Sequence, residues 1–110
     1  MIFVISTARI KRGTLDVCLA AARPCIAETL KEKGCIGYDV NTSITDPEKV
    51  VFVERWESRE HLDAHLTTEH FKVWRTKGAD FIAGRTVEII TPARAGPAII
   101  PICQRKLIKA

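Results

Sequence analysis

Residues 54–74, ERWESREHLDAHLTTEHFKVW, hold both tryptophans and all three histidines of the chain. The pattern predicts the end of a strand, a helix capped by Ser58 and a second helical segment capped by Thr68, because Ser and Thr side chains accept hydrogen bonds from the free N–H groups at a helix start. No other segment of the sequence brings so many aromatic and titratable side chains together. We therefore expect this segment to carry the chemistry and the rest of the chain to position it.

The elements outside this segment follow from hydrophobic periodicity. Alternating and β-branched residues predict strands at 2–10, 35–44, 49–57 and 84–91, with Ile36 and Tyr38 on one face of the second strand. A helix is expected between Thr14, its cap, and Gly34, with Pro24 either kinking the helix or dividing it. The resulting order, βαββαβ, is that of the ferredoxin-like α+β fold, an antiparallel sheet with helices on one face.

The predicted sheet has apolar residues on both faces. In the first strand Phe3 and Ile5 oppose Ile2 and Val4, and the helices of one chain cover only one face. A second subunit is the simplest cover for the other face, so we expect a homodimer. Residues 1–92 form the expected domain, and residues 93–110 form a C-terminal extension. We expect this extension to pack along the dimer partner, and an arm on its own subunit is the open alternative.

Composition and charge limit the function. A chain of 110 residues has the length of one domain, and its net charge of +4 comes from scattered basic residues, so no nucleic-acid groove is expected. No stretch approaches the roughly 20 apolar residues of a membrane span, and the N-terminal segment lacks the features of a signal peptide. The four cysteines have no CxxC spacing, which is typical of free buried thiols in a cytoplasmic protein.

Three segments together resemble the antibiotic biosynthesis monooxygenase family, and within it the small quinol monooxygenase type: LKEKGCIGYDV at 30–40, VVFVERWES at 50–58 and HLDAHLTTEHFKVW at 61–74. The resemblance covers roughly residues 2–92. It implies a dimeric α+β barrel with a pocket between sheet and helices. It also implies oxidation of a quinol or hydroxylated aromatic by O2 with no metal, flavin or haem cofactor. The protein then supplies position, a proton acceptor and hydrogen bonds to the developing anion.

Some branches of the family are less well matched. The polyketide-tailoring branch binds its substrate through a Trp, which corresponds to Trp56, but its Asn and Tyr positions hold Phe52 and Leu62. The haem-degrading branch differs at all three of its characteristic positions, here Ser6, His65 and Arg75. Haem degradation is therefore not expected. A branch of isomerases that act on small phosphorylated signals shares histidines near His65 and His70, and stays open.

The candidate catalytic residues are His65, His70 and Trp56. His65 matches the family motif and titrates near neutral pH, so it is the preferred proton acceptor, with a purely structural histidine as the alternative. His70 is expected at the second position of its helix, where the helix N-terminus favours neutral imidazole. The pair His61 and His65 has the spacing HxxxH but no third ligand nearby, so no metal site is expected. His61 is assigned to the surface.

The candidate substrate-binding residues are Tyr38, Glu54, Phe71 and Trp74. The aromatic residues are expected either to line a cavity for a small aromatic substrate or to serve only as core. Glu54 shares a strand face with Trp56, and an ion pair with Arg9 or Arg85 is preferred over an orientation into the pocket. Two other functions stay open beside the monooxygenase: a binding module or sensor for a small ligand without catalysis, and an isomerase.

Overall fold

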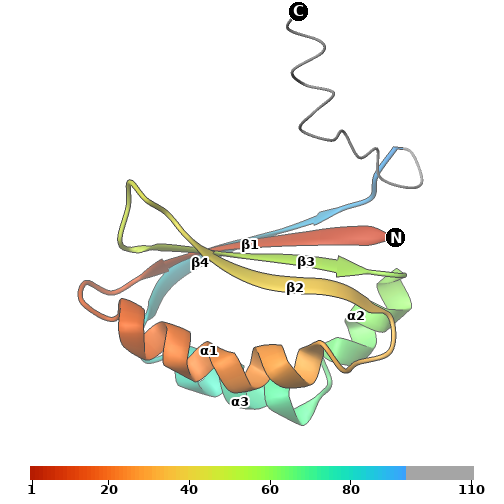
Figure 1. Cartoon of the computed structure of the whole chain (residues 1–110), viewed down its shortest axis with the longest axis horizontal. Coiled ribbons are helices and arrows are strands. Elements are labelled where there is room, and N and C mark those ends of the chain that lie inside the picture. Colours follow the sequence, from red (N-terminus) through yellow and green to blue (C-terminus); the bar gives the residue numbers. More distant parts are fainter. Residues whose placement is uncertain (94–110) are drawn as a thin grey trace, which may run out of the picture.

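The computed structural model describes residues 1–93, and Figure 1 shows how the helices and strands are arranged. The four strands form one antiparallel sheet in the order β2-β3-β1-β4, and the helices lie together on one side of it. The predicted ferredoxin-like fold is confirmed, with two short helices after β3. The elements are β1 (Ile2–Ile10), α1 (Leu15–Thr29), β2 (Cys35–Thr42), β3 (Lys49–Trp56), α2 (Arg59–His65), α3 (Glu69–Gly78) and β4 (Ile82–Ile90).

Alternation along the strands builds the core on the helix side of the sheet. In β1 and β3 every second residue is buried, among them Val4, Val50 and Phe52, while their neighbours are more exposed. From α1 the small side chains of Cys18 and Ala22 join this core, which lets the helix lie close to the sheet. Burial of this apolar surface stabilises the folded state by roughly 25 cal/mol per Å² of area removed from water, and it is the main contribution that holds the layers together.

The helix α1 differs from the predicted helix around Pro24 and at its C-terminal end. It is one continuous helix, Leu15–Thr29, so a division at Pro24 is excluded, and packing of the helix against the sheet offsets the backbone hydrogen bond that a proline removes. Gly34 has a positive φ of 85°, as a helix-terminating glycine would, but it lies in the turn before β2. The helix therefore ends earlier than predicted, and this leaves Glu32 on the turn.

Replacing Gly34 by alanine is expected to destabilise the fold more than replacing Gly13. Both glycines have positive φ, 85° and 77°, and in that region a Cβ atom costs about 1–2 kcal/mol. A Cβ on Gly34 would also collide with the ring of His61, whereas a Cβ on Gly13 would meet no heavy atom within 4 Å. Urea unfolding of the two alanine variants measures the difference. Equal losses would contradict the packing of His61 against this turn.

The strand β2 departs from simple alternation at its start. Its pairing with β3 shifts register between Cys35 and Gly37, and Ile36 is 44% exposed, whereas Tyr38 is buried. The prediction that Ile36 and Tyr38 share an environment is wrong, because an irregularity of this kind adds a residue to one strand and turns the preceding side chains over.

The face of the sheet opposite the helices is apolar, and none of the described helices covers it (Figure 1). Phe3 and Ile5 of β1 lie beside Val53 of β3 and Ile90 of β4 on this outer face. Ile90 is 40% exposed, and the other three are partly exposed. An apolar face of this kind usually marks a contact with another molecule.

The C-terminal extension lies almost entirely outside the described residues, since these end at residue 93. Its expected packing along a partner therefore stays a prediction. Within the described part of the chain, no helix is both long enough and apolar enough to cross a bilayer.

Candidate functional site

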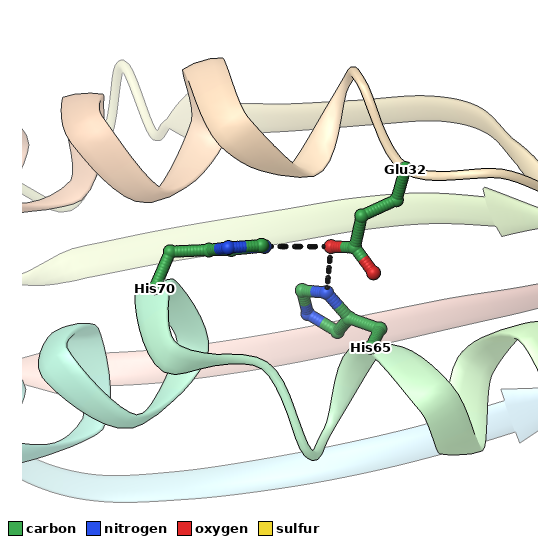
Figure 2. Close-up of side chains that lie close together, drawn as sticks. All are labelled: Glu32, His65 and His70. Carbon is green, nitrogen blue, oxygen red and sulfur yellow. Dashed lines mark hydrogen bonds and ion pairs between the residues drawn. The ribbon is translucent and has the colours of Figure 1, made fainter.

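Three side chains from separate parts of the chain meet beneath the sheet, as Figure 2 shows. The carboxylate oxygen Oε2 of Glu32 lies 2.6 Å from Nδ1 of His65 and 2.7 Å from Nε2 of His70. Glu32 comes from the turn after α1, His65 is the last residue of α2, and His70 is the second residue of α3. One carboxylate oxygen thus holds both imidazole rings.

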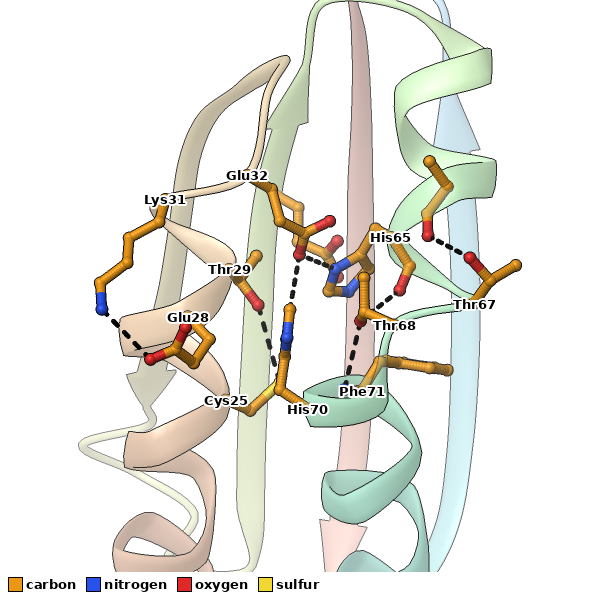
Figure 3. Close-up of polar contacts among 12 residues, drawn as sticks. Cys25, Glu28, Thr29, Lys31, Glu32, His65, Thr67, Thr68, His70 and Phe71 are labelled. Carbon is orange, nitrogen blue, oxygen red and sulfur yellow. Dashed lines mark hydrogen bonds and ion pairs between the residues drawn. The ribbon is translucent and has the colours of Figure 1, made fainter.

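The junction between α2 and α3 sets the direction of both rings (Figure 3). Thr68 donates its hydroxyl hydrogen to the carbonyl oxygen of His65 at 2.7 Å, and the hydroxyl oxygen Oγ1 of Thr68 accepts the backbone N–H of Phe71 at 3.3 Å. The threonine therefore ends one helix and caps the next, as the sequence predicted for the cap. Because the chain turns here, His65 and His70 face Glu32 from two helices.

His65 is a buried histidine surrounded by aromatic rings. Its side chain is 1% exposed, and its ring centre lies 4.8 Å from that of Trp56, 5.1 Å from that of Phe71 and 5.7 Å from that of Tyr38. Burial lowers the pKa of His65, and the hydrogen bond to Glu32 and its negative charge oppose this shift. The ring is therefore neutral over a wider pH range than a free histidine.

The contact with Glu32 fixes which nitrogen of His65 carries the proton. A neutral imidazole beside a carboxylate at 2.6 Å donates through Nδ1–H, so we assign the lone pair to Nε2. Among the described residues Nε2 is buried and has no hydrogen-bond partner. The protein thus holds an unused proton acceptor in its interior.

A cavity of about 90 Å³, which we call the His65 cavity, opens beside this ring. It is mostly apolar, with a few polar groups among its walls, as is usual for ligand sites. Its walls are Val4, Ser6, Glu54, Leu62, His65, Leu66, Phe71, Arg85, Val87 and Ile89. A smaller space of about 30 Å³, the inner recess, shares Ser6, Glu54, Phe71 and Arg85 with it and continues toward Tyr38 and Trp74.

Glu54 faces these two spaces rather than an arginine partner. It is 7% exposed, and its Oε1 accepts a hydrogen bond from Nε1 of Trp56 at 3.0 Å. Within the described residues Arg9 pairs with Asp46 instead, and no ion pair joins Glu54 to Arg85, so the preferred expectation of an ion pair is wrong. Burial raises the pKa of Glu54, while the Trp56 hydrogen bond and the charge of Arg85 lower it.

The remaining predicted site residues occupy different positions around the cluster. Phe71 lines both spaces, and Tyr38 and Trp74 line the inner recess only. Burial raises the pKa of Tyr38, so its hydroxyl keeps its proton. Trp56 is fully buried behind His65, where it orients Glu54 and does not touch either space.

His70 lies on the other side of Glu32 from the His65 cavity. Its ring is 21% exposed and lines a groove of about 380 Å³ between α1 and α3. His61 is hydrogen-bonded through Nδ1 to the hydroxyl of Ser58 at 2.8 Å and lines neither space. Of the three histidines, the structure brings only His65 into contact with the cavity.

Glu32 is the site residue that the sequence prediction missed. It lies in the segment 30–40 that resembles the monooxygenase family, between two lysines that suggested the cationic end of a helix. The two lysines and Gly34 predict a helix that continues up to Gly34, which would place Glu32 on its last turn. The signal available was an acidic residue inside a family-like segment, at a position where basic residues suit a helix end.

The cluster also offers three ligand atoms of the kind that bind transition metals. The ligand atoms of Glu32, His65 and His70 all lie within 4.8 Å of one another. Ligand atoms around a tetrahedral zinc ion, at about 2.0–2.1 Å each, would be roughly 3.3 Å apart. The two nitrogen atoms lie closer than that to one oxygen, at 2.6 and 2.7 Å, which is the spacing of hydrogen bonds.

Comparison with known proteins places the chain in a family. The family model described as antibiotic biosynthesis monooxygenase matches residues 1–77. The chain belongs to the antibiotic biosynthesis monooxygenase family. The family resemblance that the sequence suggested is thereby confirmed. The chain is 32% identical over 75 residues to the probable quinol monooxygenase YgiN of Escherichia coli K12, an alignment that covers 61% of this chain and 72% of that relative.

Solved structures of similar proteins have the same fold. A putative antibiotic biosynthesis monooxygenase from Nitrosomonas europaea is 27% identical, with a TM-score of 0.81 over 86% of this chain and all of the other. A conserved protein from Methanosarcina mazei is 28% identical, with a TM-score of 0.78 over 81% of this chain and 89% of the other. Rv0793 from Mycobacterium tuberculosis, at 24% identity and a TM-score of 0.80, supports the fold alone. The family therefore suggests a monooxygenase-type function for this fold.

Proposed function

We propose that this protein is a cofactor-independent monooxygenase that oxidises a quinol or a related hydroxylated aromatic with O2. The family and the similarity to a probable quinol monooxygenase support the reaction type. The single observation that carries the proposal is the unpartnered Nε2 of His65, a buried proton acceptor whose side chain lines an apolar cavity. Proton removal is the step that a phenolic substrate needs before it can react with O2.

The first step is transfer of the substrate hydroxyl proton to His65. A hydroxyl group in the His65 cavity donates to Nε2, and the ring becomes an imidazolium that keeps its Nδ1–H bond to Glu32. The carboxylate stabilises this positive charge at 2.6 Å. His70 donates to the same oxygen, so Glu32 is held between two N–H groups and keeps the ring of His65 in one orientation.

The second step belongs to the substrate anion and O2. An electron-rich anion passes an electron to O2, and the apolar walls keep water away from the reacting atoms. With a p-hydroquinone, the balanced outcome is one hydroxyquinone and one water molecule for each O2 consumed. The protein's part is position, the base and the exclusion of water, and we propose no metal or organic cofactor for it.

Oxygen uptake by the purified protein tests this function. With a reduced naphthoquinone as substrate and a chelator present, we expect O2 consumption well above the rate of spontaneous oxidation, with hydroxyquinone as the product. No excess rate across several hydroquinones and naphthoquinols would refute the proposal. Tight ligand binding without O2 consumption would instead support a binding module, and turnover of a phosphorylated compound without O2 would support an isomerase.

We further propose that the protein acts as a homodimer joined through the outer face of the sheet, in the cytoplasm. The partly exposed Ile5, Val53 and Ile90 supply an apolar surface for a second copy. The free thiols Cys18 and Cys25 suit a reducing compartment.

Placing a charge on the outer face is expected to separate the subunits. The variant Val53→Lys would bury an unpaired ammonium group in the contact, so we expect a monomer in analytical ultracentrifugation where the parent protein sediments as a dimer. Val17→Lys is the matched control, since Val17 is 59% exposed on α1, away from the sheet. A monomeric parent protein, or a Val53→Lys variant that remains dimeric, would contradict this interface.

A further inference from the structure

A second charged group reaches the site from the far edge of the sheet. Arg85 on β4 lies opposite Ala8 of β1, on the face that carries the helices, and lines both the His65 cavity and the inner recess. Among residues 1–93 its guanidinium forms no ion pair, whereas Arg9, on the neighbouring strand, is bonded to Asp46 at 2.7 Å. Arg85 is an exposed residue, and among the described residues its guanidinium has no carboxylate partner, so its N–H donors are available to an anion at the edge of the cavity.

The acidic group that shares these walls is already engaged. Glu54 accepts the indole N–H of Trp56 at 3.0 Å. The positive charge of Arg85 lowers the pKa of the Glu54 carboxyl, but no ion pair joins the two side chains among the described residues. Because Arg85 is exposed, its guanidinium is hydrated in the free protein, and an acidic group on a bound ligand would give it a charged partner at the edge of the cavity.

We propose that Arg85 binds an acidic substituent of the substrate, so that the substrate is a hydroxylated aromatic acid. The proposal rests on the proposed function in one respect only, which is that the hydroxyl group of the substrate binds beside Nε2 of His65. The ring lies between Phe71 and the apolar side chains of α2, and the carboxylate meets Arg85 at the edge formed by β4. A guanidinium matches a carboxylate with two parallel N–H donors, which a neutral ring cannot use.

Binding measured without oxygen tests this assignment independently of turnover. In anaerobic calorimetry the parent protein should bind 2,5-dihydroxybenzoate about 2- to 5-fold more tightly than hydroquinone, the range that an ion pair at an exposed arginine supplies. Arg85→Gln should remove most of this preference while leaving the affinity for hydroquinone nearly unchanged, and Arg85→Lys should retain part of it. Arg12→Gln, which removes an exposed arginine in the turn after β1, should behave like the parent.

The outcomes separate this inference from the proposed function. Equal affinities of the parent protein for the two ligands, or an acid preference that survives in Arg85→Gln, would overturn the role of Arg85 even if hydroquinone is oxidised. Preferential binding of the acid that Arg85→Gln abolishes would support the role even if no O2 is consumed. If Arg85 only stabilises Glu54, then Glu54→Gln and Arg85→Gln should lower the affinities for 2,5-dihydroxybenzoate and for hydroquinone by the same factor. That result would also count against the proposal.

Discussion

Replacing His65 by glutamine is expected to lower kcat/KM for quinol oxidation by about 10²- to 10⁴-fold, the usual contribution of a positioned general base. Glutamine keeps a polar side chain in the buried position but has no nitrogen that accepts a proton near neutral pH. The KM should change much less than kcat, because the walls of the His65 cavity remain. Initial rates of oxygen uptake with a reduced naphthoquinone measure the loss, and the melting temperature establishes that the variant is folded.

The matched control for this variant is His61→Gln. His61 lies on the same helix, but its Nδ1 is bonded to Ser58 and its ring lies outside the cavity. We expect its kcat/KM to stay close to that of the parent protein. Full activity in His65→Gln would exclude His65 as the base. Equal losses of kcat/KM in both variants would show that the substitutions act by disturbing the fold of α2.

Replacing Glu32 by glutamine is expected to lower the plateau of kcat/KM by about 10- to 100-fold, as loss of a carboxylate behind a functional histidine commonly does. It should also change the pH profile. Only neutral His65 accepts a proton, so kcat/KM falls as the pH drops through the pKa of His65. Burial lowers that pKa and Glu32 raises it, so removing the carboxylate lowers it further, and the acidic limb moves to lower pH.

Two further variants separate this effect from a general loss of negative charge. Glu28→Gln removes an exposed carboxylate that pairs with Lys31 at 3.2 Å, so neither the plateau nor the acidic limb should move. His70→Gln leaves Glu32 in place against His65 and should cost less than Glu32→Gln. A Glu32→Gln profile whose acidic limb moves to higher pH would contradict the assigned arrangement.

The sequence was informative where local rules decide the structure. Strand alternation around Phe52 and the side-chain caps Ser58 and Thr68 depend on residues close in the chain, so the fold and the division between α2 and α3 were predictable. The same locality placed His65 correctly at the end of a helix next to a strand with Trp56. These features need no knowledge of distant segments.

The rest of the site depends on contacts between distant residues. Glu32 and His65 are 33 positions apart, and their bond follows from where α1 stops. The lysines on either side of Glu32 and the glycine at position 34 predict that end several residues too late. Glu54 was assigned to an arginine because a buried carboxylate needs a partner, and the partner is the indole N–H of Trp56, two residues along the same strand. The position of His70 on the groove between α1 and α3 depends on how these two helices pack, and no local sequence pattern predicts that packing.

The oxygen atom of Glu32 that both histidines share also affects whether unfolded copies of the protein can reduce O2 to superoxide. The base is aligned only when the turn after α1 and the junction between α2 and α3 are both in place, since each supplies one side of the same hydrogen bond. A chain that has lost either contact lacks the aligned base and forms little of the anion that reduces O2. Damaged or partly unfolded copies should therefore lose activity rather than release superoxide. In a urea titration, the oxidation activity should be lost at the same urea concentration as the folded structure, or at a lower one.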